Sequence, residues 1–165
     1  MKINRLVLGP LDTNCYILIE NNECIIIDPA DDYELIKKYI KDKKLVGVII
    51  THHHFDHVGA ISNFDCGLIY DKNNLEEKSY TLGNFTFDII YTPGHKEDCI
   101  TIYFKEEQVM FTGDFIFKGV IGRTDLPGGN MNEMKNSLIK ISKYDKNIKV
   151  YPGHGDYTYL KDEIK

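Results

Sequence analysis

The chain has 165 residues, of which 42% are hydrophobic and 27% charged, and its 20 Lys and Arg against 25 Asp and Glu give a formal net charge of −5. This is the composition of an ordinary globular protein, and an acidic balance without a basic run argues against a nucleic-acid partner. The apolar runs fall far short of the ~20 residues that cross a bilayer, so we expect no membrane partner. The N-terminal segment lacks the features of a secretion signal, which predicts a cytoplasmic protein.

The four cysteines contain no C-x-x-C pair, and nothing indicates an oxidising compartment, so we expect no disulfide framework. Free cysteine packs as a small hydrophobic residue. We therefore interpret Cys15, Cys24 and Cys66 as buried thiols. The role of Cys99 stays open because it lies only four residues after His95.

The first part of the chain predicts strands followed by one helix. Asn21 and Asn22 form a dipeptide that tolerates a tight hairpin turn. Asp31 and Glu34 resemble a capping box, which predicts a helix that ends near Lys43. The last strand is almost entirely apolar, as expected when both of its faces are covered. The predicted strands are Lys2–Leu8, Cys15–Glu20, Glu23–Ile27 and Leu45–Ile50.

The second part repeats this order in outline. Gly119–Gly129 is rich in glycine and predicts a loop. Asn130 and Glu133 then provide a second capping signal, and a helical apolar stripe follows them. The stripe consists of Met131, Met134, Leu138 and Ile141. The predicted strands are Leu68–Tyr70, Phe85–Thr92, Cys99–Phe104, Val109–Thr112 and Lys149–Tyr151.

These elements predict the α/β (α+β) class, with two mixed sheets packed face to face and helices outside. No linker or low-complexity segment interrupts the chain. We therefore expect residues 1–165 to form a single domain, without a separate C-terminal substrate domain. Loops at the strand ends would then meet at one edge of the two sheets.

Four of the six histidines lie in the short segment from His52 to His57, directly after the apolar strand. His52 and His54 are two residues apart, so in extended backbone their side chains point the same way. Asp56 and His57 follow closely enough to face a second ion. The alternate position of His53 should turn it away from this pair, and we interpret Phe55 as a packing residue.

Three further candidates each follow a β-like run and a glycine, namely His95, Asp114 and His154. Imidazole and carboxylate ligands are typical of first-row metal sites with open positions, whereas closed structural zinc sites favour thiolates. Surface histidines have no reason to cluster in this way, and a buried cluster would be hard to satisfy without a cation. The pattern therefore predicts two divalent metal ions, with Zn favoured and Fe or Mn also accepted by these ligands.

The motif Thr51-His-His-His-Phe-Asp-His57 resembles the signature of the metallo-β-lactamase superfamily, in its glyoxalase II (hydroxyacylglutathione hydrolase) branch. The resemblance implies an αββα four-layer sandwich. It also implies a first metal on His52, His54 and His95, a second metal on Asp56, His57 and His154, and Asp114 as the bridge between them. The other motifs occur in the order of the family, and they are Asn14-Cys15-Tyr16, Asp28-Pro29, Thr92-Pro-Gly-His95, Phe111-Thr-Gly-Asp114 and Tyr151-Pro-Gly-His154.

The segment from Gly113 to Gly129 is similar to small single-domain glyoxalase II-like hydrolases of bacteria and to persulfide dioxygenases. Arg123 occupies the place of a basic residue that contacts glutathione in the larger enzymes. Those enzymes have a helical C-terminal domain. They also have a Tyr-bearing continuation at the position where this chain has Gly155 and Asp156. The thiol carrier therefore stays open.

We expect a metal-dependent hydrolase in which a metal-bridging hydroxide attacks a thioester such as S-lactoylglutathione. Asp56 would act as the catalytic residue that orients the hydroxide, and Arg123 would bind a substrate carboxylate, with Lys118 as a weaker candidate. Three alternatives remain. They are a persulfide dioxygenase with one iron on a His set and Asp114, a lactone or other ester hydrolase on the same site, and a non-enzymatic metal-stabilised domain. The oligomeric state is open.

Overall fold

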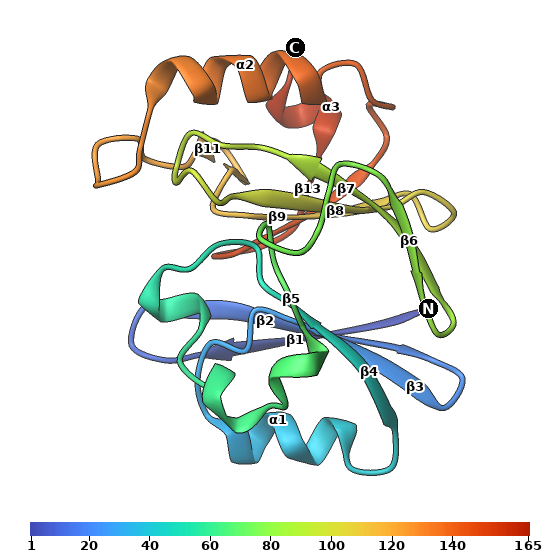
Figure 1. Cartoon of the computed structure of the whole chain (residues 1–165). Coiled ribbons are helices and arrows are strands. Elements are labelled where there is room, and N and C mark those ends of the chain that lie inside the picture. Colours follow the sequence, from blue (N-terminus) through green and yellow to red (C-terminus); the bar gives the residue numbers. More distant parts are fainter.

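A computed structural model describes residues 1–165 and consists of two facing β-sheets with helices on both outer sides (Figure 1). The first sheet contains β1 (Lys2–Leu8), β2 (Thr13–Glu20), β3 (Glu23–Ile27), β4 (Lys44–Ile49) and β5 (Ile69–Tyr70), in that order. The second contains β6 (Ser79–Leu82), β7 (Phe85–Tyr91), β8 (Ile100–Phe104), β9 (Val109–Gly113), β12 (Lys149–Pro152) and β13 (Thr158–Tyr159). A separate ribbon pairs β10 (Ile116–Phe117) with β11 (Val120–Ile121).

Both sheets are mixed. In the first sheet, β1, β2 and β3 are antiparallel, whereas β4 lies parallel to both β3 and β5. The second sheet has the order β13-β12-β9-β8-β7-β6, and only β12 and β9 are parallel in it. The helices are α1 (Tyr33–Ile40), α2 (Met131–Ile141) and α3 (Leu160–Glu163), and the 3₁₀ turns are η1 (Phe55–His57), η2 (Ile61–Asn63) and η3 (Cys66–Leu68).

Successive side chains of a strand point to opposite faces of its sheet, and the apolar ones form three layers. Leu18 and Ile25 lie in the central cluster, where they meet the aromatic residues of the second sheet. Their neighbours Ile17 and Ile26 face the opposite way and pack with Ile36 of α1. This pattern is what successive side chains on opposite faces of a strand require when both faces are covered.

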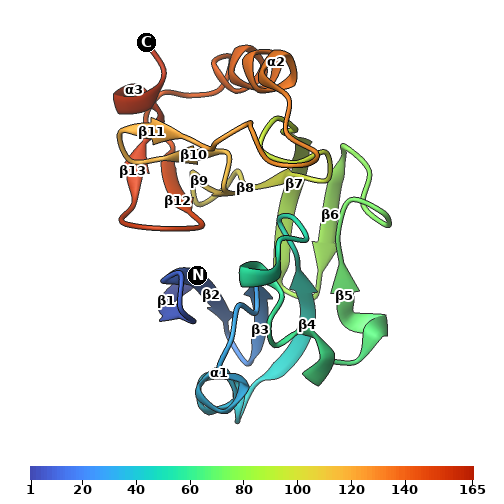
Figure 2. The same ribbon diagram turned by 90° about the vertical axis from the view of Figure 1, so that its left-hand side faces the viewer.

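The second sheet is covered in the same way. Met110 and Val150 point away from the central layer and pack against Met134 and Ile141 of α2 and Leu160 of α3. Figure 2 shows the resulting order of helix, sheet, sheet and helices in a second view. The predicted four-layer αββα sandwich is therefore confirmed.

The first helix differs from its prediction at both ends. Its N-cap is Asp32, not Asp31, because the Asp32 carboxylate accepts a hydrogen bond from the backbone N–H of Leu35 at 3.2 Å. The helix ends at Ile40, since the N–H of Lys43 donates to the Ile40 carbonyl at 3.0 Å and closes a turn. The capping of α2 by Asn130 is as predicted.

Other differences concern short elements. Cys66 is exposed rather than buried, because it lies in η3, where the Asp65 side chain accepts from the N–H of Gly67. The predicted loop Gly119–Gly129 contains β11, which pairs with β10. The elements β6, β10, β13 and α3 were not predicted. Cys15 and Cys24 are buried as predicted.

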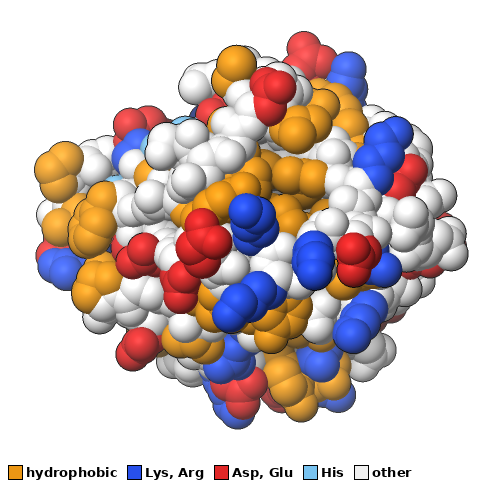
Figure 3. Space-filling view, turned by 90° about the horizontal axis from the view of Figure 1, so that it is seen from below, with side chains coloured by type: hydrophobic (Ala, Val, Ile, Leu, Met, Phe, Trp, Pro, Cys, Tyr) orange, Lys and Arg blue, Asp and Glu red, His pale blue; other side chains and the backbone are white.

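None of the helices of this protein is both long enough and apolar enough to cross a membrane. On the face seen in Figure 3, which carries α1, acidic side chains lie among the basic ones. This face therefore offers no continuous basic stripe of the kind that follows a phosphate backbone.

The central layer predicts a large stability effect at Ile25, which is fully buried between the sheets. Ile25→Ala removes buried apolar atoms and leaves a cavity, so we expect unfolding free energy to fall by about 2–5 kcal/mol in urea denaturation. Ile139→Ala on the 60% exposed side chain of α2 is the matched control and should change it by less than ~0.5 kcal/mol. Equal effects of the two substitutions would contradict this layer assignment.

Candidate metal centre

The seven predicted ligand residues converge at one end of the two sheets, where each follows a strand or a short turn. His52 and His54 come after β4, and Asp56 and His57 lie in η1. His95 lies in the loop between β7 and β8. Asp114 follows β9, and His154 follows β12. Because β9 and β12 are parallel neighbours with Pro152 opposite Gly113, their carboxyl ends place the last two ligands side by side.

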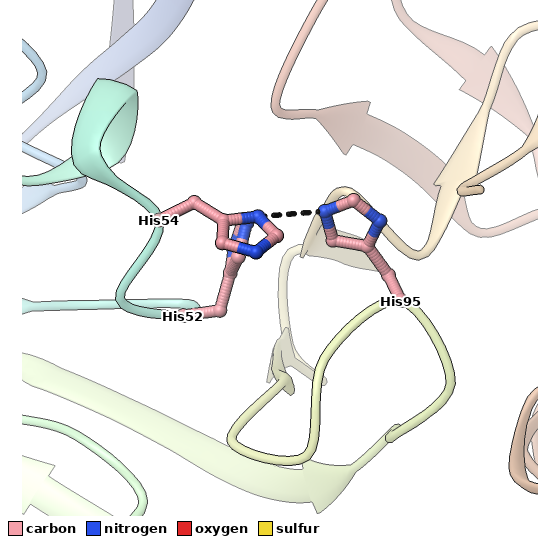
Figure 4. Close-up of side chains that lie close together, drawn as sticks. All are labelled: His52, His54 and His95. Atoms are coloured by element: carbon pink, nitrogen blue, oxygen red, sulfur yellow. Dashed lines mark hydrogen bonds between the residues drawn. The ribbon is translucent and has the colours of Figure 1, made fainter. Parts of the chain in front are cut away.

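The side chains form two groups, and the ligand atoms within each group lie within 4.8 Å of one another. The first group is His52, His54 and His95 (Figure 4). Its members come from both sheets, and Nε2 of His95 lies 3.0 Å from Nδ1 of His54. The second group is Asp56, His57, Asp114 and His154.

Asp114 belongs to the second group and also lies close to the first. Its Oδ2 is 3.5 Å from Nε2 of His95 and 3.4 Å from Nε2 of His154, and its Oδ1 is 3.2 Å from Nε2 of His57. In the second group, Oδ2 of Asp56 lies 3.1 Å from Nε2 of His154. One carboxylate is thus placed to contact ions on both sides.

Three buried polar atoms at this place have no hydrogen-bond partner, namely Nε2 of His52, Nε2 of His57 and Oδ1 of Asp114. Buried polar atoms without partners are costly, and all three point into the ligand cluster. Divalent cations would satisfy them, and a donor set of imidazoles and carboxylates suits Zn, Fe or Mn. The residues present therefore fit a pair of divalent metal ions.

A second layer of contacts orients these ligands, and Asp28 is its centre. Its Oδ2 accepts from the Thr51 hydroxyl at 2.6 Å and lies 2.7 Å from Nδ1 of His57, and its Oδ1 accepts from the Thr51 N–H at 2.8 Å. The Thr51 hydroxyl is in turn 3.1 Å from Nδ1 of His52. Such contacts fix which imidazole nitrogen faces the metal. Asp28 had no predicted role, although its place after β3, beside the parallel strand β4, was a usable signal.

Glycine is required beside the cluster at Gly153. A Cβ there would lie 2.3 Å from Oδ1 of Asp114 and 2.7 Å from Cε1 of His57, which no side chain could tolerate. The Pro-Gly-His motif thus uses its glycine to let the backbone approach two ligands closely. Gly113 has a φ of 55° and a similarly close approach to Thr51.

Burial and charge act on the histidines in opposite directions. Burial lowers the pKa of His52 well below its usual value and also lowers the pKa of His54, so both imidazoles are neutral at pH 7, which is their ligand form. Burial also opposes charging of His57, but Asp28 and Asp114 outweigh it and raise the pKa of His57 to about 10. The neighbouring carboxylates raise the pKa of His154 to about 10 in the same way, against burial.

The two carboxylates stay ionised. Burial tends to raise the pKa of Asp114, but the nearby imidazoles of His154 and His57 outweigh it, and the pKa falls well below its usual value. At Asp56 burial also tends to raise the pKa, but contacts with His154, His57 and Thr13 outweigh it and lower the pKa to about 2. Divalent cations would therefore meet two negative charges, and binding would displace the protons of two imidazoles.

The Metallo-beta-lactamase superfamily model matches residues 8–65 and 69–154, which include all seven residues of the cluster. The chain belongs to this superfamily. Its members are metal-dependent hydrolases. The similarity to a solved metallo-beta-lactamase structure confirms the expected fold. The resemblance inferred from the His motif is likewise confirmed.

Curated relatives and solved structures agree with this assignment. The chain is 31% identical to the probable metallo-hydrolase YqgX of Bacillus subtilis, covering 99% of this chain and 94% of that protein. It is 31% identical to a hydroxyacylglutathione hydrolase of Francisella tularensis subsp. novicida, covering 95% of this chain and 68% of that protein. Two crystal structures are also similar. The B3 metallo-beta-lactamase BLEG-1 has a TM-score of 0.91 and is 29% identical, with 98% of this chain and 95% of that chain covered. TTHA1623 in a di-iron-bound form has a TM-score of 0.85 and is 27% identical, with 96% of this chain and 95% of that chain covered.

A cavity of about 520 Å³ opens over the cluster. Arg123 lines it, and its backbone carbonyl lies 2.8 Å from Nδ1 of His95. Its guanidinium pairs with Asp125. Lys118, the weaker candidate, does not line the cavity.

Phe55 is 72% exposed at the cavity, so its interpretation as a packing residue is wrong. The turn η1 directs its ring outward, while His57 of the same turn is buried. The full lining is Leu11, His54, Phe55, Asp56, His95, Lys96, Asp114, Arg123, Leu126, Pro127 and His154.

His53 points away from the cluster, as expected. Its Nε2 lies 2.7 Å from Oδ2 of Asp71.

His54 and His53 form a matched pair for mutation, since only His54 faces the cluster. We expect His54→Ala or Asp114→Ala to abolish metal loading and turnover together, measured by elemental analysis and hydrolysis rate. His53→Ala should retain both. Full hydrolysis by a verified metal-free variant would refute the metal centre.

Asp28 offers a second test, because it touches the ligands without belonging to either group. Asp28→Asn removes the charge that orients His57, and we expect metal affinity to fall about 10–100-fold in chelator competition. Asp71→Asn, which alters the carboxylate beside His53, is the matched control. Unchanged affinity in a folded Asp28→Asn variant would show that this contact does not tune the site.

Proposed function

We propose that the chain hydrolyses a thioester at two divalent metal ions, with Zn as the preferred metal. The observation that carries the proposal is the presence of two complete ligand groups beneath one open cavity. The similarity to a hydroxyacylglutathione hydrolase supports the thioester as substrate class, and the di-iron form of TTHA1623 supports two ions in this fold.

In this proposal His52, His54 and His95 hold the first ion, Asp56, His57 and His154 hold the second, and Asp114 contacts both. When bound, such a pair supplies Lewis acidity to a carbonyl and lowers the pKa of water towards ~7. The protein contributes by holding the donors in place before any ion binds. The buried unpartnered nitrogens of His52 and His57 are the clearest sign of this preparation.

Asp56 is the proposed catalytic residue. Asp56 lines the cavity, and its carboxylate accepts a hydrogen bond from the Thr13 hydroxyl at 3.0 Å. This contact fixes the orientation of the carboxylate, and its pKa of about 2 keeps it an acceptor at neutral pH. Asp56 can therefore orient the attacking water by accepting a hydrogen bond from it.

No side-chain nucleophile is part of the proposal. Cys99 is the nearest candidate in sequence, but it is buried, and burial raises the pKa of its thiol well above the usual range. A neutral buried thiol is a poor nucleophile. Water is thus the attacking group: its oxygen bonds to the acyl carbon, the C–S bond breaks, and the departing thiolate takes up the proton that water loses.

The second ligand group argues for two ions rather than one. A persulfide dioxygenase with one iron would need only a His set and a carboxylate, and would leave the group around Asp56 and His154 without a ligand role. The open cavity argues against a closed structural site, in which four protein ligands complete the coordination sphere. Arg123 stays a predicted substrate contact because it lines this cavity.

A substrate panel run with each metal tests the proposal. Protein loaded with Zn, Fe or Mn is assayed on S-lactoylglutathione, simpler thioesters, lactones and β-lactams, and oxygen uptake is followed on a persulfide. We expect thioester hydrolysis with two ions per chain and no oxygen uptake. One iron per chain with oxygen uptake would establish the dioxygenase instead, and a preference for lactones or β-lactams would change the substrate class.

A further inference from the structure

The mouth of the cavity is apolar and exposed. Leu11 is 51% exposed, Phe55 72% and Leu126 37%, and Pro127 lies beside them. The residues come from the loop before β2, from η1 and from the segment before α2, so three separate parts of the chain bring apolar groups to one opening. Exposed apolar groups gathered around a cavity are typical of a binding surface.

The arginine at this mouth is already paired. Nε of Arg123 donates to Oδ1 of Asp125 at 2.7 Å, and its NH2 nitrogen donates to Oδ2 at 2.8 Å. This is the two-point geometry with which a guanidinium would bind a substrate carboxylate. The hydrogen bond from Arg123 lowers the pKa of Asp125 to about 2, so the carboxylate stays charged.

The lysine at the mouth is paired as well. Nζ of Lys96 lies 3.1 Å from Oδ1 of Asp98 and 3.6 Å from Oε1 of Glu97. Asp98 is itself held, because its Oδ2 accepts from the backbone N–H of His53 at 2.8 Å. Arg123 and Lys96, the arginine and lysine of the cavity lining, thus each already have a carboxylate partner.

We propose that this mouth selects substrates whose carrier group is apolar and uncharged, and that Asp125 determines this specificity by holding Arg123 in a neutral pair. The inference rests on the proposed thioester hydrolysis. It assigns Arg123 a contact with substrate as one half of an ion pair and not as a clamp for a carboxylate.

Two physical effects work in the same direction. An anionic carrier would have to displace Asp125 from Arg123 and lose its own hydration against apolar side chains. An apolar carrier would instead remove Phe55, Leu11 and Leu126 from water, which is favourable in proportion to the area covered. The preference should therefore appear in binding as well as in turnover.

A pair of substrates that differ only in one carboxylate group tests the proposal. They are the acetyl thioesters of benzyl mercaptan and of 4-(mercaptomethyl)benzoate, with the corresponding non-hydrolysable acetonyl thioethers for calorimetry. With metal-loaded protein we expect kcat/KM and affinity to favour the neutral member by about fivefold or more. Equal or better use of the benzoate would overturn the carrier assignment.

Asp125→Asn releases Arg123 and should raise the benzoate-to-benzyl ratio of kcat/KM about three- to fivefold, an effect that salt should reduce. Glu76→Gln, which alters the exposed pair with Lys78, is the matched control and should leave the ratio unchanged. An unchanged ratio in Asp125→Asn would show that the pair does not determine specificity.

Phe55→Ser and Leu126→Ser test the apolar surface. Each should raise KM for the benzyl thioester about threefold or more with metal content retained, whereas Ile139→Ser on α2 should not. Unchanged KM in both variants would refute a role for this surface. If the neutral thioether binds preferentially but no thioester is cleaved, the proposed reaction fails while the carrier preference stands. If both thioesters are cleaved and the benzoate is preferred, the proposed reaction stands and the carrier preference fails.

Discussion

The site depends on the hydrogen bonds that fix the two sheets against each other at one end. Nδ2 of Asn14 donates to the carbonyls of Pro152 and Gly155 at 2.9 and 2.8 Å, and the hydroxyl of Tyr16 donates to the Pro152 carbonyl at 2.6 Å. The backbone N–H of Asn14 also donates to the Gly153 carbonyl at 2.7 Å. These contacts join β2 of the first sheet to the end of β12 in the second sheet and to the residues that follow it. Because ligands come from both sheets, a shift between the sheets would separate the two halves of the cluster, and a well-fixed ligand set is what metal catalysis requires.

The same cluster couples folding to metal binding. Packing five imidazoles and two carboxylates into one place leaves unpartnered atoms on His52, His57 and Asp114. The carboxylates and the charged forms of His57 and His154 balance one another, as the opposite pKa directions show. A divalent ion replaces that proton-based balance with direct ligation and satisfies the buried atoms. The catalytic arrangement is therefore also the arrangement in which these polar groups are best satisfied, and the surrounding apolar layers hold it in place.

The sequence predicted which polar side chains gather at one place better than it predicted the small elements around them, for a physical reason. Each ligand follows an apolar run and a turn, and these signals are local. The short strand β11 and the exposure of Cys66 depend on tertiary contacts that no local pattern records. The outward ring of Phe55 depends on how η1 turns, which the alternation rule for extended backbone does not describe. Asp28 is an intermediate case, because its role follows only once β3 and β4 are known to be parallel neighbours.

Chemistry and selectivity are carried by different residues in this fold. The ligand cluster, which the superfamily model covers, determines which bonds can be hydrolysed. The mouth determines which molecules reach it, and its character depends on pairs such as Arg123 with Asp125, only two residues apart in the chain. A basic residue at a position known to contact an anion is uninformative without its neighbour, because a carboxylate two residues away can occupy the same donors. For this chain, the substrate class is therefore better inferred from the charge balance around the cavity than from the metal motif or from a single cation.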